Sequence, residues 1–350
     1  MKIEDIPIDG YERVAHATCD ASGLNAVIAV HDTTLGPALG GIRVTPYEFD
    51  DACITDATRL AKGMTYKAAI AETGQGGGKG VMNIDPAAAT KDMYYAMGDF
   101  IEALGGTYLA AEDMNMTVAN LQLIAARTDY VTGLALADGY SGNPSPITAH
   151  GCHIGLQATA LERFGAASLK GRCIAIQGIG AVGSVLAKLC LEDGATVAIC
   201  DIDQSRVEIF AKETRAIALE HSDAALTYPC DILSPCARGG VLNPDSIPEL
   251  QCQAIGGAAN NQLLNDSDSE LLYKRGILYA PDYVINAGGI INIACEFDEG
   301  GYSAENARKR CYSIQRALQE VFHIAQSQKI TTAQAANQLA ESRINTGRRA

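Results

Sequence analysis

The sequence is poor in positive charge. It has 27 lysine and arginine residues against 41 aspartate and glutamate residues, which gives a formal net charge of −14. Nucleic acids and anionic membrane surfaces bind proteins through basic patches, so this charge argues against both as main partners. An anionic small molecule is still compatible with it, because a local pair of lysines can outweigh a distant, screened acidic surface.

The sequence predicts no secretory or membrane-spanning segment. The N-terminus, Met1 to Asp5, has no apolar signal-peptide region, and no apolar run approaches the length of a membrane span. Cysteine is plentiful, with 11 residues, but the number is odd and no pair has CxxC spacing. We therefore expect reduced thiols in the core of a cytoplasmic protein, and neither a disulfide framework nor a zinc site.

The length of 350 residues and the order of the apolar segments predict an α/β protein of two domains. In the first part, strands are expected at 25–30 and 107–111, and helices at 51–62 and 94–104. Glycine and proline cluster between Asp138 and Pro146, so we place the crossover between domains there. The expected domains are 1–140 for substrate and oligomerisation and 141–330 for the dinucleotide, with a C-terminal helix at 331–350 packed back on the first.

The second part begins as a βαβ unit. Strands are expected at 173–177 and 195–200, with a glycine turn and a helix to about Cys190 between them, and further strands at 230–233 and 254–255. Strands that alternate with helices in this way imply a parallel, doubly wound, Rossmann-type sheet. One long helix is expected after Ser303, and its apolar stripe from Ala307 to Ala325 indicates ordinary core packing.

A glycine-rich turn in the second part carries a binding motif. Residues 178–183, Gly-Ile-Gly-Ala-Val-Gly, follow a predicted strand and open a helix, and Asp201 lies 18 positions after Gly183. This context is the fingerprint of a dinucleotide site at a helix N-terminus. Asp201 would bind the adenosine ribose and repel a 2′-phosphate, which favours NAD over NADP, although the nearby Arg206 weakens that preference. The expected loop residues are Gly178, Gly180, Ala181, Val182 and Gly183.

Two lysines lie close together in the first part. Lys67 ends the run Met-Thr-Tyr-Lys, and Lys79 ends the run Gly-Gly-Gly-Lys twelve positions later. Three consecutive glycines usually mark a turn or a close ligand approach, so we expect a glycine loop that presents Lys79. If Lys79 is partly buried, its pKa falls and it can accept a proton near neutral pH. The alternative is a flexible hairpin tip with a solvated lysine.

Other polar residues follow predicted strands. Asp113 comes after the strand at 107–111, on the side where α/β sheets bind ligands, and its alternative role is to cap a helix that begins near Thr117. Small residues and amides at 257–262 and 281–289 are candidates for binding, with turns as the alternative. His150 and His153 lack any pattern of metal ligands, so we interpret them as structural.

Together these segments resemble the amino acid dehydrogenases of the glutamate, leucine, phenylalanine and valine group, with the leucine dehydrogenase branch most similar. The matching segments run in order through nearly the whole chain: 36–41, 64–67, 76–79, 111–113, 142–148, 178–183, 259–262 and 286–289.

The resemblance implies reversible, NAD-dependent oxidative deamination of an L-amino acid to a 2-oxo acid and ammonia. It also implies a homo-oligomer, a dimer or an octamer, whose active-site cleft between the domains closes and excludes water. It assigns Lys67 to the substrate carboxylate, Lys79 with water to general base catalysis, and Asp113 to proton transfer at the amino nitrogen. Thr148, Asn260 and Asn261 are assigned to the cofactor and substrate.

By the same resemblance, the pocket for the substrate side chain is formed by Leu39, Gly40, Met64, Ala111, Ile290 and Ile293. None of these is charged, and glutamate dehydrogenases place a lysine where Leu39 stands. Leucine dehydrogenases commonly have valine at both isoleucine positions, so the pocket is expected to be narrower here and to take a branched-chain aliphatic amino acid.

Two alternatives and one departure accompany this interpretation. The chain could be a dehydrogenase for an aromatic amino acid such as phenylalanine. It could also be an inactive NAD-binding sensor, which the presence of both Lys79 and Asp113 disfavours. The departure is Met116, because leucine dehydrogenases more often have small residues in the loop after Asp113.

Overall fold

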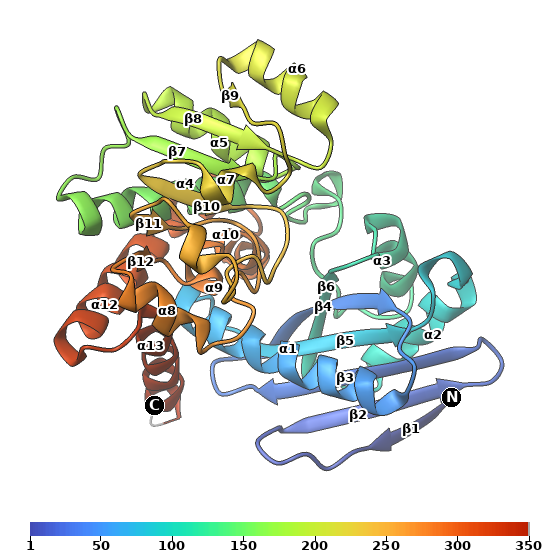
Figure 1. The fold of residues 1–350 in the computed structure, drawn as a ribbon. Helices are drawn as coiled ribbons and strands as arrows, with labels where there is room; N and C mark the ends of the chain where they lie inside the picture. Colours follow the sequence, from blue (N-terminus) through green and yellow to red (C-terminus); the bar gives the residue numbers. More distant parts are fainter. Residues whose placement is uncertain (349–350) are drawn as a thin grey trace. The chain divides into compact units, whose positions relative to one another are not determined.

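The computed structural model describes residues 1–348, and the chain forms two compact units (Figure 1). Unit 1 comprises Met1–Asn143, Ile293–Ser303 and the described chain from Ala340 onward, and unit 2 comprises Pro144–Asn292 and Ala304–Leu339. The chain therefore first changes unit inside the glycine- and proline-rich segment. The division differs in three places from the expected domains: 141–143 and 293–303 join unit 1, and 331–339 belongs to unit 2.

Unit 1 is built on a six-stranded mixed sheet in the order β1-β2-β3-β5-β4-β6. Strands β1, β2, β3 and β5 pair antiparallel, whereas β4 runs parallel to β5 and β6. The strands are β1 Lys2–Asp5, β2 Arg13–Cys19, β3 Leu24–Asp32, β4 Ala38–Thr45, β5 Gly76–Asn83 and β6 Tyr108–Glu112. The helices are α1 Asp50–Ala71, α2 Lys91–Glu102 and α3 Val118–Ala125, with 3₁₀ turns η1 Pro86–Ala88, η2 Leu136–Asp138 and η4 Cys295–Phe297.

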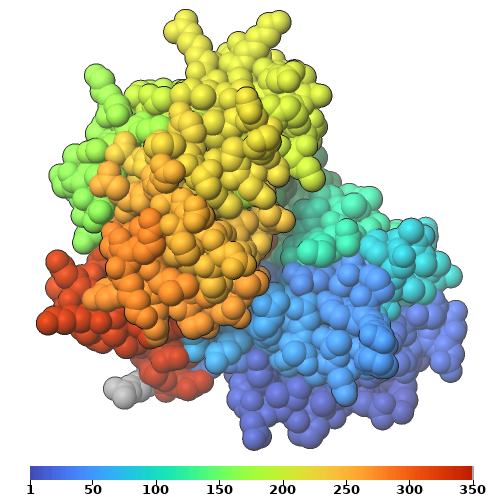
Figure 2. Space-filling model, in the orientation of Figure 1, coloured from blue at the N-terminus to red at the C-terminus, as the bar shows by residue number. Residues whose placement is uncertain are grey.

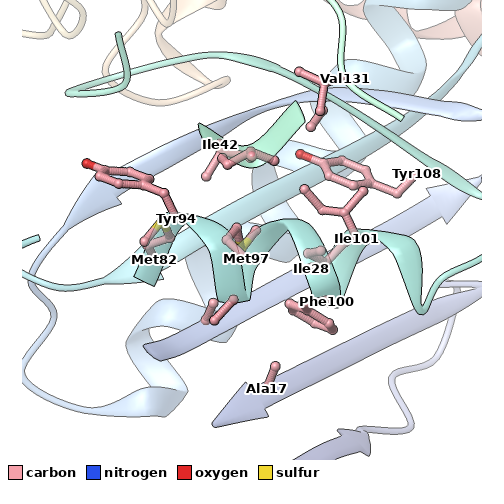
Figure 3. Close-up of a cluster of buried hydrophobic side chains, with 14 of the residues drawn as sticks. Ala17, Ile28, Ile42, Met82, Tyr94, Met97, Phe100, Ile101, Tyr108 and Val131 are labelled. Carbon is pink, nitrogen blue, oxygen red and sulfur yellow. The ribbon is translucent and has the colours of Figure 1, made fainter. Parts of the chain in front are cut away.

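Both faces of this sheet are buried, which explains the unbroken apolar run in β3. Successive side chains of a strand point to opposite faces. Val27 belongs to a cluster that includes Cys53 and Ala57 of α1, whereas the adjacent Ile28 belongs to a cluster that includes Phe100 of α2. Figure 3 shows this second cluster, in which α2 packs its apolar side chains against the strands. The strands predicted at 25–30 and 107–111 are thus confirmed within one or two residues.

The prediction of a glycine loop before Lys79 is wrong, because Gly76 to Lys79 begin the buried strand β5. The glycines are there for close packing. A Cβ on Gly77 would lie 2.0 Å from the backbone nitrogen of Thr65 on α1, and one on Gly78 would lie 2.7 Å from the ring of Tyr108. The missing side chains therefore let a helix and an aromatic ring approach the strand from opposite faces.

Unit 2 is built on a parallel sheet in the order β12-β11-β10-β7-β8-β9. The strands are β7 Cys173–Gln177, β8 Thr196–Cys200, β9 Ile217–Ala218, β10 Ile232–Pro235, β11 Ala254–Ile255 and β12 Leu278–Tyr279. The helices that begin in this unit are α4 Ser145–Phe164, α5 Gly183–Glu192, α6 Gln204–Thr214, α7 Ala224–Thr227, α8 Asp268–Lys274, α9 Asp282–Ile285, α10 Gly288–Ala294, α11 Ala304–Arg310, α12 Tyr312–Gln328 and α13 Thr332–Gly347, with a 3₁₀ turn η3 Ile247–Glu249. The last residues of α10 and α13 belong to unit 1. The Rossmann-type sheet predicted from the sequence is confirmed.

The long helix predicted after Ser303 is divided into α11 and α12 at Cys311. The amide of Ile314 donates to the carbonyl of Cys311, three residues back, at 3.0 Å. This tighter bond interrupts the α-helical pattern at that point. The apolar stripe from Ala307 to Ala325 is buried, as its periodicity predicts.

The end of α13 packs on unit 1. The guanidinium of Arg343 donates to the carbonyl of Ile70 at 2.6 Å and pairs with Glu72 at 3.2 Å. Tyr66 donates to Glu341 at 2.8 Å. The expected C-terminal helix at 331–350 runs into positions 349 and 350, which lie outside the described residues.

In the space-filling view, side chains fill the spaces that the ribbon leaves open within each unit (Figure 2). Within residues 1–348, no helix has the length and apolar character that crossing a membrane requires.

Candidate functional site

Lys79 is buried in the middle of the unit 1 sheet. Its side chain is 5% exposed, and by strand alternation it lies on the same face of β5 as Gly77, the face that α1 covers. Burial lowers the pKa of the Lys79 ammonium from its usual value, while the nearby Asp113 opposes this shift. Lys79 is therefore poised to lose its proton more easily than a solvated lysine.

Asp113 is the direct partner of Lys79. The Lys79 Nζ and Asp113 Oδ2 atoms are 2.7 Å apart, and the Nε of Arg43 lies 3.0 Å from the same oxygen. Burial favours a higher pKa for Asp113, but these two cations outweigh it and hold that pKa below its ordinary value. In the described part of the chain, Oδ1 of Asp113 accepts no hydrogen bond. An ionised carboxylate with one oxygen open can exchange a proton with a bound molecule.

The strand pairing explains how Asp113 reaches this position. Residues 38–42 of β4 pair in register with 108–112 of β6, so Arg43 and Asp113 follow side by side. Gly41 leaves room for the approach, since a Cβ there would lie 2.7 Å from the Cβ of Asp113. Asp113 does not cap α3; the side chain of Thr117 does, by accepting from the amide of Asn120.

Arg43 is the residue of this site that sequence reasoning missed. Besides Asp113, it binds Asp56 of α1 at 2.8 Å, and Asp56 also accepts from Tyr47 and Arg59. The signal was available, because Arg43 comes two residues after the Gly-Gly pair of the resemblance motif at 36–41. Its partner, however, is 70 residues away in sequence.

The other expected residues of unit 1 lie on β4, β6 and α1. Leu39 is 1% exposed and sits on β4 between Gly77 and Leu109, and Ala111 is buried on β6. Met64 and Lys67 lie partly buried on α1. Gly40 has no space for a side chain, because a Cβ would lie 1.7 Å from the carbonyl oxygen of Gly78.

Met116, the departure from the family pattern, is a core residue of unit 1. Its side chain is 4% exposed and belongs to the core cluster on the α2 face. The loop before it is held by Asn115, whose side-chain amide donates to the carbonyl of Val44 at 2.9 Å. Met116 thus fills the core beneath the loop, and Asp113 keeps its position.

In unit 2, the three glycines of the 178–183 loop meet different requirements. Gly178 has φ +94°, which favours glycine, and Gly183 has no space, since its Cβ would lie 2.0 Å from the carbonyl oxygen of Gly178. A Cβ on Gly180 would instead meet no heavy atom within 4 Å. The loop therefore has a tight turn, a tightly packed helix start, and an open surface over Gly180 between them. These are the conditions for a pyrophosphate at a helix N-terminus, so the residues fit a dinucleotide.

Asp201 stands beside this loop, at the C-terminal end of β8. It is 8% exposed, and its carboxylate accepts from the amides of Ile179 at 2.9 Å and Asp203 at 3.0 Å. Arg206 lies 3.6 Å from the same carboxylate and 3.4 Å from that of Asp203. Asp201 thus holds the glycine loop through the amide of Ile179, and its carboxylate places a negative charge beside that loop.

The remaining expected residues of unit 2 lie in the chain after β11 and in the first turns of α4 and α10. The side-chain amide of Asn286, which lies in the candidate segment 281–289, donates to Oδ1 of Asn260 at 2.7 Å. Asn261 has φ +51°, a conformation that asparagine tolerates better than most residues. In the first turn of α4, Thr148 donates to the carbonyl of Pro144 at 2.9 Å.

Ile290 and Ile293 lie three positions apart on the helix α10, as the pocket prediction assumed. Ile290 is buried in unit 2, whereas Ile293 is partly buried and belongs to unit 1.

The histidines and cysteines show no metal arrangement. His153 pairs with Asp193 at 2.9 Å, which links α4 to the end of α5. Within residues 1–348, no group of three or more histidine, cysteine, aspartate or glutamate side chains is arranged to hold a metal ion. The eleven cysteines are free thiols.

Comparison with known proteins gives consistent matches. The model of the Glu/Leu/Phe/Val dehydrogenase dimerisation domain matches residues 12–130, and that of the Glutamate/Leucine/Phenylalanine/Valine dehydrogenases matches 198–350. A leucine dehydrogenase of Geobacillus stearothermophilus is 45% identical over 341 residues, which cover 97% of this chain and 92% of that protein. An L-tryptophan dehydrogenase of Nostoc punctiforme is 41% identical over 341 residues, which cover 97% and 95%.

The similarity extends to three-dimensional structure. The crystal structure of L-tryptophan dehydrogenase from Nostoc punctiforme matches with a TM-score of 0.87 and 39% sequence identity. The match covers 97% of this chain and 98% of that one.

Proposed function

The chain belongs to the glutamate/leucine/phenylalanine/valine dehydrogenase family, and on that premise we propose that it catalyses the NAD-dependent, reversible oxidative deamination of a branched-chain aliphatic L-amino acid. The products are the 2-oxo acid and ammonia. The observation that carries the proposal is the ion pair of the buried Lys79 with the partly buried Asp113, which joins a lysine of lowered pKa to a carboxylate of lowered pKa. A nicotinamide cofactor follows from the family.

The proposed roles follow the charges of the groups. A bound nicotinamide would supply the acceptor for the hydride that leaves the substrate Cα. Lys67 supplies the cation for the substrate carboxylate. Lys79 in its neutral form takes a proton from the water that adds to the imine carbon, and Asp113 moves protons to and from the amino nitrogen. Thr148, Asn260 and Asn261 orient the nicotinamide and the substrate.

The uncharged residues of the expected side-chain pocket support an aliphatic substrate. Leu39 and Ala111 are both buried and present no group that could pair with a second carboxylate. Burying the unpaired γ-carboxylate of glutamate there would cost on the order of several kcal/mol. Ile290 and Ile293 each add a methylene relative to valine, which disfavours a phenyl ring. A methylene changes selectivity by only about 10–200-fold at most, so the order among leucine, valine and isoleucine is left to experiment.

The substrate assignment is tested by kcat/KM for leucine, valine, isoleucine, phenylalanine and glutamate at saturating NAD. We expect one of the three branched-chain amino acids to exceed phenylalanine by at least about tenfold, with glutamate lowest. The second candidate is an aromatic amino acid dehydrogenase, which the relationship to L-tryptophan dehydrogenase favours. A higher kcat/KM for phenylalanine or tryptophan would establish that candidate instead.

The preference for NAD is tested at Asp201. We expect the wild type to use NAD in strong preference to NADP, because the carboxylate repels a 2′-phosphate. Asp201→Asn keeps an oxygen that can accept from Ile179 and removes the charge, so the ratio of kcat/KM for NAD to that for NADP should fall by about tenfold, which corresponds to 1.4 kcal/mol. Equal use of both cofactors by the wild type contradicts the assignment.

The pH profile is tested at Arg43. Its positive charge lowers the pKa of both Lys79 and Asp113, so Arg43→Gln should raise both. Lys79 acts only when deprotonated, so kcat/KM for deamination should rise with pH in the wild type, and in the variant this rise should move to higher pH. If the pH profile of the variant is unchanged or moves to lower pH, Arg43 does not lower the pKa of Lys79. The matched control is Arg13→Gln, since Arg13 pairs with Asp5 on the surface of the same sheet.

We also propose that the protein is a homo-oligomer, a dimer or an octamer. The match of residues 12–130 to a dimerisation domain supports this. Its mass in solution decides between the two states.

A further inference from the structure

Arg238 lies at the place in unit 2 where a parallel sheet binds its ligand. In the sheet, β8 and β9 lie on one side of β7 and β10 to β12 on the other, so the strand order reverses between β7 and β10. Ligands of such sheets bind outside the carboxyl ends of the strands at this point. Arg238 comes three residues after the end of β10.

The residue next to Arg238 touches the glycine loop. A Cβ on Gly178 would lie 2.7 Å from the Cβ of Ala237 and 2.9 Å from its nitrogen. The Cys236 amide, one residue earlier, donates to the carbonyl of Gln177 at 2.7 Å. The chain that carries Arg238 is therefore held directly against the turn that begins the dinucleotide loop.

Two side chains hold the guanidinium at this place. Nη2 of Arg238 donates to Oδ2 of Asp223 at 3.0 Å, and the other oxygen of Asp223 accepts from Nε2 of Gln177 at 2.6 Å. Gln177 is the last residue of β7 and is 2% exposed, so the pair is anchored on the strand that leads into the loop.

The guanidinium has donors to spare. Arg238 makes one hydrogen bond among the described residues, through one N–H of Nη2, and its side chain is 69% exposed. The second N–H of Nη2 therefore stays available for a parallel pair with a neighbouring N–H of Nε or Nη1. A planar guanidinium binds phosphate oxygens with two parallel hydrogen bonds. In addition, Oε1 of the buried Gln177 has no hydrogen-bond partner in the described chain, so a second polar group beside the loop is also incomplete.

We propose that Arg238, positioned by Asp223, is a cofactor-binding residue that donates hydrogen bonds to the pyrophosphate of the nicotinamide dinucleotide; this rests on the proposed function. An exposed ion pair adds little to folding stability, so the role of Arg238 in binding can be measured separately from any role in folding. The open surface over Gly180 and the N-terminus of α5 are the other elements of this proposed anion site.

The test measures ligand binding to the full-length protein without amino acid substrate. Dissociation constants for NADH are measured by fluorescence, and those for ADP-ribose and adenosine by calorimetry. Arg238→Gln should raise the dissociation constants of NADH and ADP-ribose by about tenfold. It should leave the dissociation constant of adenosine unchanged, because adenosine has no phosphate. The unfolding temperature should stay that of the wild type. The matched control, Arg163→Gln, replaces an exposed arginine at the end of α4 and should change none of these constants.

The anchor is tested by a double-mutant cycle. Asp223→Asn should weaken NADH binding less than Arg238→Gln does. The double variant should bind NADH as well as Arg238→Gln alone, because Asp223 acts through Arg238. NADH affinity of Arg238→Gln within twofold of the wild type overturns the proposal, as does equal weakening of adenosine. If the wild type binds NADH and turns over leucine, this failure leaves the proposed function intact. A wild type that binds no NADH refutes both.

Discussion

Lys79→Ala is expected to lower kcat for deamination by about 10²–10⁴-fold while the chain still folds and binds NADH. The side chain removed is the buried lysine 2.7 Å from Asp113, so the proposed base is lost. The carboxylate does not become unpaired, because Arg43 remains 3.0 Å from it. Asp113→Asn should cause a loss of the same order. Turnover, the dissociation constant of NADH and the unfolding temperature are measured for each variant.

Two further variants separate charge from volume and position. Lys79→Met fills most of the space of the lysine without its charge, and it should be as inactive as Lys79→Ala. Lys62→Ala removes an exposed lysine from α1 and should leave kcat unchanged. Lys67→Ala should mainly raise KM, because it removes the cation for the substrate carboxylate. If Lys79→Ala kept more than about a tenth of the wild-type kcat, its role as general base would be wrong.

Gly180→Ala is expected to fold like the wild type and to bind NADH at least about tenfold more weakly. The added Cβ meets no protein atom within 4 Å, so it costs nothing in packing, but it occupies the surface where the pyrophosphate would lie. Gly183→Ala is expected to behave in the opposite way. Its Cβ would lie 2.0 Å from the carbonyl oxygen of Gly178, so it should reduce the free energy of unfolding by about 1–3 kcal/mol.

Thermal unfolding without ligand and NADH titration separate these two effects. The matched control is Gly63→Ala on α1, where a Cβ also meets nothing within 4 Å, but far in sequence from the dinucleotide loop. It should raise stability slightly, because alanine favours a helix over glycine, and leave NADH binding unchanged. Wild-type NADH affinity in Gly180→Ala would mean that the pyrophosphate does not lie over this glycine.

Local pattern was enough where a segment's surroundings follow from its own residues. The strand at 173–177, the glycine turn and the following helix were all predicted, and they form β7, the 178–183 loop and α5. A βαβ unit has short-range connections and alternates strand and helix, so its apolar runs and turn glycines indicate it directly. The same reasoning placed Asp201 at the end of β8.

Local pattern was misleading where packing decides. Three consecutive glycines predicted a loop, yet Gly76 to Gly78 form a strand because Thr65 and Tyr108 approach it from both faces. One helix was predicted after Ser303, but it is divided at Cys311, whose carbonyl accepts a hydrogen bond from the amide of Ile314, three residues later. Neither effect is visible in the segment itself, because its cause lies in other elements or in a single backbone bond.

The sequence by itself determined the family, the parallel dinucleotide-binding sheet and the two residues proposed for proton transfer, because motifs of fixed spacing carry them. Only the tertiary structure decided the electrostatics around those residues. Arg43 and Asp113 are 70 positions apart in the chain, and the pairing of β4 with β6 brings them together. Burial beneath α1 lowers the pKa of Lys79, and a motif cannot specify burial, because it depends on every element packed around the side chain.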